Sequence, residues 1–222
     1  MNISTNGFLI HARDYKESSS IINIFSSEKG LQSLLFKGKN NNKNRFKFSV
    51  FNEYNFTFND NYSLPYLSKF EIVNEYNFNK KYYLLGLYIN ELLYKTLKEG
   101  YDFEKIYNHY REFLVYLSNT SDSLTRLALL FEKNLIQDLG YEITMADTSS
   151  ISHTLTYTYD FDHGFVRSPS FDNQLSISGD KLSSFFDNTL TCEKSISILR
   201  STIREILKGV YPNINLIGDQ LF

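Results

Sequence analysis

The sequence predicts an α+β protein, because strand-like segments fill its first third and amphipathic helices fill most of the rest. Residues 82–100, YYLLGLYINELLYKTLKEG, are the first long segment with a helical pattern. Apolar side chains cover so much of this segment that a helix here must be buried on more than one side. We therefore expect a core helix that joins a β module to a helical module.

The composition is that of a globular protein with ample core material, since 42% of the 222 residues are hydrophobic and 16% are aromatic. No run of about 18 apolar residues indicates a membrane span. The first ten residues lack the basic start and apolar stretch of a signal peptide, so the protein is expected in the cytoplasm. Cys192 is the only cysteine, which excludes an intramolecular disulfide and a cysteine-rich zinc site.

The N-terminal part contains short apolar or alternating segments bounded by turn residues. In one of them Phe56 and Phe58 alternate with Asn55 and Thr57, which is typical of a half-buried strand. The predicted strands are residues 6–11, 19–25, 31–36, 50–58 and 62–73. Five short strands in about 75 residues fit a small closed barrel of the OB type.

The remainder is predicted to be helical. Ser121 or Asp122 can cap the third helix, which ends before Gly140. The helices after the first are expected at residues 103–117, 124–139, 180–188 and 194–208, with a hairpin at 154–161 and 164–166. The predicted domains are an OB-fold nucleic-acid-binding domain at 1–78 and a helical domain at 79–222. The helical domain carries a small β element inserted at 143–172, and the isolated protein is expected to be a monomer.

The charge is unevenly distributed. The net charge is −2, yet residues 29–52 contain six basic residues and no acidic one. Most of these cations lie in a predicted loop, KGKNNNKNRFK, at residues 37–47. Such a loop next to a barrel is suited to phosphate contacts, but a solvated loop that only aids solubility has the same composition.

Motifs along nearly the whole chain resemble the bacterial RecO family of recombination mediators in their order and spacing. They are GFLIH (7–11), RDY (13–15), ESS (17–19), EKG (28–30), FKGK (36–39), GLYINELL (86–93), FE (131–132), LGY (139–141), residues 157–165 and DN (172–173). The architecture of that family, an OB fold followed by a helical domain with a small β insertion, agrees with the one predicted above.

The resemblance implies a protein without enzymatic activity or cofactors that acts in DNA repair and recombination. It implies binding of single- and double-stranded DNA and annealing of strands coated by single-strand-binding protein. It also implies cooperation with RecR to load RecA in the RecFOR pathway. The active protein is then expected at the nucleoid. The expected DNA contacts are Arg13, Lys37, Lys39, Lys43, Arg45 and Lys47. The alternative is a scaffold that bridges RecR and single-strand-binding protein with little affinity for DNA.

The chain departs from the family pattern at several places. Many relatives hold zinc with four cysteines in the region that here reads MADTSSISHTLTY, residues 145–157. We therefore expect no metal, and the hairpin must be held by packing. A basic pair common in the family is replaced by Leu129 and Leu130, and its basic C-terminal tail is replaced by NINLIGDQLF, residues 213–222.

An enzyme is the competing interpretation of the hairpin, where His153, Asp160, Asp162 and His163 crowd together. A metal or hydrolase site could be drawn from these residues. However, Asp162-His163-Gly164 is more simply a turn, because aspartate is favoured there for its hydrogen bonds to the backbone. No glycine-rich phosphate loop indicates use of ATP.

The last predicted helix carries Arg200, Arg204 and Lys208 at steps of four, which places them on one narrow strip. In the family that the chain resembles, the helical domain receives the acidic, Phe-terminated tail of single-strand-binding protein, which requires a cation beside an apolar pocket. We nominate Arg200 and Arg204 for this role, with Arg126 as a third. The alternative is a solvated face partly paired with Glu205.

Overall fold

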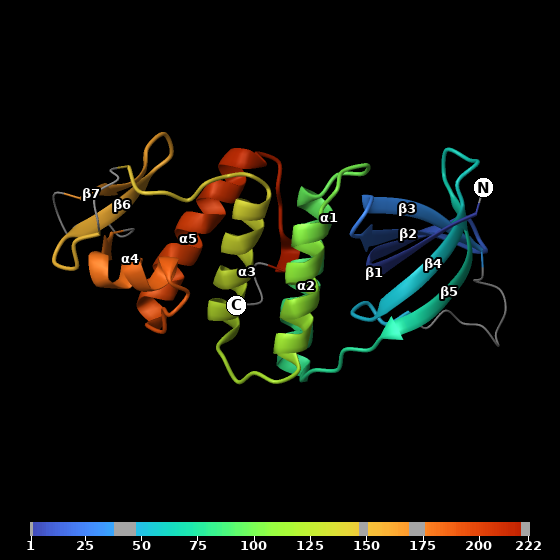
Figure 1. Ribbon diagram of the computed structural model, residues 1–222, viewed down its shortest axis with the longest axis horizontal. Helices are drawn as coiled ribbons and strands as arrows, with labels where there is room; N and C mark the ends of the chain where they lie inside the picture. The colour runs from blue at the N-terminus through green and yellow to red at the C-terminus, as the bar shows by residue number, and fades with distance from the viewer. Residues whose placement is uncertain (1, 38–47, 147–150, 169–175, 219–222) are drawn as a thin grey trace. The chain divides into compact units, whose positions relative to one another are not determined.

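The computed structural model describes residues 2–37, 48–146, 151–168 and 176–218. These residues form two compact units. The first unit extends to Thr120 and also includes residues 216–218, and the second runs from Ser121 to Asn215. Figure 1 labels most helices and strands of both.

Within the described residues, five strands of the first unit close into a barrel with the order β1-β2-β3-β5-β4. This order is that of an OB fold and confirms the predicted fold of the N-terminal part. The strands are β1 Asn2–Tyr15, β2 Ser19–Ser26, β3 Gly30–Lys37, β4 Glu53–Asn59 and β5 Tyr66–Asn74.

The barrel has an apolar interior because its side chains alternate along each strand. In β4, Tyr54, Phe56 and Phe58 are almost completely buried, whereas Asn55 and Thr57 between them are partly exposed. The same cluster includes Leu9, Ile22, Ile24, Leu34 and Leu67 from the other strands. Removing one such aliphatic or Phe side chain from water is worth about 1.5–3 kcal/mol, so these residues hold the strands together.

In the first unit, α1 Lys80–Thr96 packs on β1 and α2 Glu104–Leu117 packs on β2 (Figure 1). The approach of α1 is close, because a Cβ added to Gly86 would lie only 2.6 Å from Cε1 of Phe51. The helix ends earlier than predicted, at Thr96 instead of residue 100, and Leu97 adopts an extended backbone.

The second unit is built on α3 Leu124–Asp138 and α5 Glu193–Val210, which pack against each other. It also contains α4 Gly179–Phe186 and a small sheet in the order β7-β6-β8. The strands of this sheet are β6 Thr156–Asp160, β7 Gly164–Arg167 and β8 Ile177–Ser178. The helices and the β6–β7 hairpin confirm the predicted architecture, whereas β8 is too short to leave a pattern in the sequence.

Two local assignments are corrected by the structure. The side chain of Ser123, rather than that of Ser121 or Asp122, accepts the backbone N–H of Arg126 and caps α3. The predicted final strand of the barrel begins four residues too early, because residues 62–65 belong to the loop before β5.

Candidate nucleic-acid interface

Arg13 and Lys37, two of the predicted DNA contacts, lie on one outer face of the barrel. Arg13 pairs with Ile21 on β2, and Ile21 pairs with Leu35 on β3. Lys37 lies two residues beyond Leu35, so its side chain leaves the same side of the strand. Arg13 and Leu35 are separated across the sheet by two strand spacings, roughly 10 Å. Both cations are exposed, so a single ligand can reach them together.

The loop between β4 and β5 borders this face. It is tied to β3, because the backbone N–H of Leu35 donates to the carbonyl oxygen of Pro65 at 2.7 Å and Leu35 pairs with Tyr66. The turn between β1 and β2, residues 16–18, follows Tyr15, which is linked to Lys37 through Ser19. OB barrels bind oligonucleotides with the face of strands 2 and 3 and with these two loops.

A cavity of about 500 Å³, here called the rim pocket, opens beside this loop. Its described lining residues are Leu35, Lys37, Asn59, Tyr62, Ser63, Leu64 and Tyr66. The ammonium of Lys37 lies 5.4 Å from the centre of the Tyr66 ring, within the range of a cation–π contact. Tyr62 is 66% exposed. The pocket therefore offers a positive charge and an accessible aromatic ring.

The other predicted DNA contacts, Lys39, Lys43, Arg45 and Lys47, lie outside the described residues and stay predictions. They follow Lys37 directly in the sequence. The acidic residue of the β4–β5 loop, Asp60, is paired with Lys29 at 3.8 Å. This pairing reduces the repulsion that its carboxylate would exert on a phosphate backbone.

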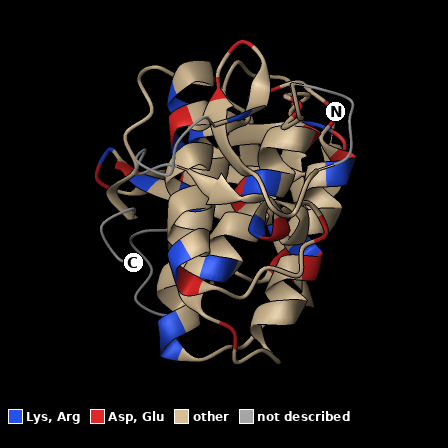
Figure 2. Ribbon diagram, turned by 90° about the vertical axis from the view of Figure 1, so that its left-hand side faces the viewer, with Lys and Arg blue, Asp and Glu red and all other residues tan. Residues whose placement is uncertain are grey.

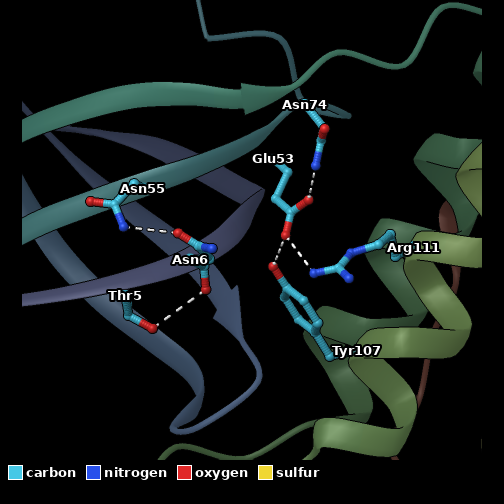
Figure 3. Close-up of polar contacts among 7 residues, drawn as sticks. All are labelled: Thr5, Asn6, Glu53, Asn55, Asn74, Tyr107 and Arg111. Atoms are coloured by element: carbon cyan, nitrogen blue, oxygen red, sulfur yellow. Dashed lines mark hydrogen bonds and ion pairs between the residues drawn. The ribbon is translucent and has the colours of Figure 1, made fainter.

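Glu53 fixes the barrel against α2 (Figure 3). Its carboxylate accepts hydrogen bonds from the Tyr107 hydroxyl at 2.7 Å, Arg111 at 2.8 Å and the Asn74 amide at 2.7 Å. Burial raises the pKa of the Glu53 carboxyl, but these three hydrogen bonds outweigh it and hold the pKa below its usual value. Burial and the adjacent carboxylate raise the pKa of Tyr107. This buried charge is structural and lies away from the rim pocket residues.

In the second unit, Arg200, which the sequence pattern nominates to bind a partner, is buried. Its side chain is only 4% exposed, and its Nε donates to Glu132 on α3 at 3.2 Å. Glu132 is itself fully buried. The strip of cations on α5 therefore runs from the interior outward: Arg204 is half-buried, and Lys208 is exposed and paired with Glu205 at 2.8 Å.

Arg126 also serves the fold of this unit. Its Nε donates to the carbonyl oxygen of Leu190 at 2.9 Å, a second nitrogen donates to that of Asn188 at 3.1 Å, and a third pairs with Asp122. The guanidinium thus holds the chain after α4 against the start of α3. The predicted roles of Arg126, Arg200 and Arg204 in binding a partner stay predictions.

Lys133 is a buried cation whose role the sequence pattern did not indicate. Its ammonium donates to the carbonyl oxygens of Phe185 at 2.7 Å and Phe186 at 3.0 Å, and to the Asn188 side chain at 3.0 Å. These carbonyls end α4, where the helix dipole favours a positive charge. Burial lowers the pKa of Lys133, while Asp187 opposes that shift.

Figure 2 shows Lys and Arg interspersed with Asp and Glu along the ribbon. At the hairpin, Asp160 accepts the backbone N–H groups of Asp162 at 3.0 Å and His163 at 2.9 Å, and its carboxylate also contacts the His163 ring at 2.7 Å. The turn is stabilised as predicted, but by Asp160 rather than by Asp162.

The part of the chain that the structure describes contains neither a membrane-spanning helix nor a candidate metal cluster. None of the helices in that part of the chain is both long and apolar enough to cross a membrane. Nor do His, Cys, Asp and Glu side chains of those residues gather in groups of three or more that could hold a metal ion.

Comparison with known proteins connects this geometry to a family. The family model described as Recombination protein O N terminal matches residues 1–76, and the one described as Recombination protein O C terminal matches residues 79–208. The chain belongs to the RecO family. RecO proteins act in DNA repair and recombination, and the family resemblance of the sequence motifs is thereby confirmed.

Several RecO relatives match over almost their whole length. DNA repair protein RecO of Actinobacillus pleuropneumoniae serotype 7 is 24% identical, with 97% of this chain and 92% of the relative covered. The RecO proteins of Hamiltonella defensa and Aliivibrio salmonicida are 26% and 25% identical, with 97% of this chain and 94% and 93% of the relatives covered.

The two RecO models meet between β5 and α1, close to the predicted boundary at residues 78 and 79. The compact units divide later, after Thr120, because α1 and α2 pack on the barrel. Thus the segment matched by the C-terminal RecO model contributes helices to both units. The predicted domain boundary itself stays a prediction.

Proposed function

We propose that this chain is a recombination mediator that binds DNA through its barrel and anneals complementary strands coated by single-strand-binding protein. With RecR, it promotes the loading of RecA. Membership of the RecO family supports a role in repair and recombination. The observation that carries the binding proposal is the placement of Arg13, Lys37 and the rim pocket beside the loops that bind oligonucleotides in OB barrels.

The mediator works without catalysis of its own. Annealing needs a surface that holds phosphates and bases transiently, and cations with an exposed aromatic ring supply this. The acidic and histidine side chains of the hairpin support the same proposal, because Asp160 is engaged in the turn and His163 is 70% exposed in open solvent. The protein acts in the cytoplasm and joins the nucleoid when it functions.

An annealing assay tests this function. Complementary oligonucleotides are coated with the cognate single-strand-binding protein, and duplex formation is followed by fluorescence with and without the chain. The proposal predicts that annealing is faster with the chain than without it. When RecR and RecA are also present, it predicts faster strand invasion. Binding of RecR and of single-strand-binding protein without any DNA binding would instead support the scaffold. Release of nucleotides from the oligonucleotides would contradict the proposal that the protein has no catalytic activity.

A further inference from the structure

We propose that the rim pocket takes one unstacked base of a single DNA strand, and that the barrel thereby prefers single-stranded over double-stranded DNA. This inference rests on the proposed function, since it assumes that the barrel binds DNA. It adds the chemical form of the ligand and a residue, Tyr62, that the sequence pattern did not nominate.

The pocket is built by tertiary structure rather than by one flexible loop. The barrel closes where Leu35 of β3 pairs with Tyr66 of β5, and the Leu35 N–H to Pro65 hydrogen bond of 2.7 Å fixes the loop beside that junction. At the other end of the loop, the Asn59 side chain accepts the backbone N–H of Asn61 at 3.0 Å. The residues between these anchors, Tyr62, Ser63 and Leu64, line the cavity.

Tyr62 has the chemistry of a stacking platform. It is 66% exposed, although burial of an aromatic ring is favourable. A base placed on the ring would cover apolar surface on both partners. Such stacking tolerates any sequence, because every base has a π face.

Lys37 supplies the matching charge. Its ammonium lies 5.4 Å from the Tyr66 ring centre, and both residues line the pocket. A strand whose base rests on Tyr62 therefore has a cation nearby for its phosphate. Arg13, on the same outer face, can take a phosphate further along the strand.

The size of the pocket decides between single and double strands. Its volume of about 500 Å³ falls within the roughly 300–1,000 Å³ of small-molecule sites. It is therefore suited to a base with its sugar rather than to a duplex. A base inside a duplex can enter only after it unpairs and unstacks, which costs a few kcal/mol. A single strand has already lost its pairing.

A tryptophan reporter tests whether a base enters. The chain contains no Trp, so Tyr62→Trp places a single indole at the pocket. Binding of an unlabelled oligothymidine should quench its fluorescence, while a blunt duplex of the same length should not. If anisotropy shows that the oligothymidine is bound and the indole is unaffected, the base does not reach the pocket and the inference fails.

Affinity gives the second arm of the test. Tyr62→Ala should weaken binding of oligothymidine by about 5- to 150-fold and leave duplex binding unchanged. Tyr62→Phe should retain the affinity. Tyr101→Ala is the matched control, since Tyr101 is 58% exposed in the same unit and its carbonyl lies near Gly30, at the opposite end of β3 from Lys37.

The outcomes separate this inference from the proposed function. Equal binding of oligothymidine by the wild type and Tyr62→Ala overturns the pocket and leaves the mediator in place. Equal losses for single strands and duplex would also overturn it, because Tyr62 would then contribute no preference for single strands. No binding of DNA by the wild-type chain would overturn both.

Discussion

The Nε of Arg200 on α5 donates to the carboxylate of Glu132 on α3 at 3.2 Å, and both side chains are almost completely buried. This pair joins the two helices on which the second unit is built. A buried charge that loses its partner is costly, because neither water nor an opposite charge then compensates it. The pair therefore gives Arg200 a role in the fold, whatever partner the unit binds.

Arg200→Ala should destabilise the protein by about 3–5 kcal/mol, because it leaves the Glu132 carboxylate buried without its guanidinium. Urea unfolding followed by circular dichroism measures this loss. Ser201→Ala, at an exposed neighbouring position on α5, is the control and should change the free energy of unfolding by less than about 0.5 kcal/mol. A variant as stable as wild type would contradict the structural role of the pair.

Lys133→Met should cost about 1.5–3 kcal/mol, because it removes a charged hydrogen-bond donor from the C-terminal carbonyls of α4 while keeping a long side chain. The control is Lys181→Met on α4, whose side chain is 40% exposed and pairs with Asp180 at 3.2 Å; such surface pairs contribute about 0–1 kcal/mol. Thermal unfolding should therefore give a lower melting temperature for Lys133→Met than for Lys181→Met. Similar melting temperatures would show that the cap is unimportant.

Glu53→Gln should remove a pH-dependent part of the stability. The folded protein holds the Glu53 pKa below its unfolded value of about 4.3, so its contribution is present above that value and is lost as the pH falls through the lower, folded pKa. At pH 7 the variant should be less stable by about 1–3 kcal/mol. This gap should narrow on acidification. A gap that stays constant from pH 7 to pH 3 would show that the carboxylate charge is not the cause.

The strands and helices could be predicted because each element has its own periodic signal. Alternation around Phe56 and Phe58 predicts a barrel strand, and the apolar face of residues 82–100 predicts α1. The start of β1 gives a weaker signal, since its outward side chains are polar. There Ser4 donates to the Asn55 side chain at 2.7 Å. The Asn55 amide donates to Asn6 at 2.8 Å (Figure 3).

The buried cations could not be predicted because their partners are distant in the sequence. Arg200 meets Glu132 across 68 residues, and Lys133 meets Phe185 across 52. Spacing along a helix shows which residues share a strip, but not whether that strip faces solvent or another helix. The rim pocket was missed for a similar reason, since residues 62–65 continue a strand-like pattern that only the barrel's closure interrupts.

The basic residues after Lys37 give a prediction that rests on the sequence. If they contact phosphates, replacing Lys39, Lys43 and Arg45 by Ala should weaken binding to all DNA sequences alike. The dependence of log affinity on log salt should also flatten, by about 0.7 for each lost contact with a single strand. Unchanged affinity and slope would remove this loop from the interface.

The most direct test of the account is the salt dependence of single-stranded DNA binding by Arg13→Ala/Lys37→Ala. These two exposed cations share one outer face of the barrel. Fluorescence anisotropy over a range of salt concentrations should show weaker binding and a slope lower in magnitude by about 1.4 than that of wild type. Lys80→Ala/Lys98→Ala, which removes an exposed cation at the start of α1 and another just after its end, should keep the wild-type slope. A double variant of Arg13 and Lys37 with wild-type affinity and slope would contradict DNA binding by this face of the barrel.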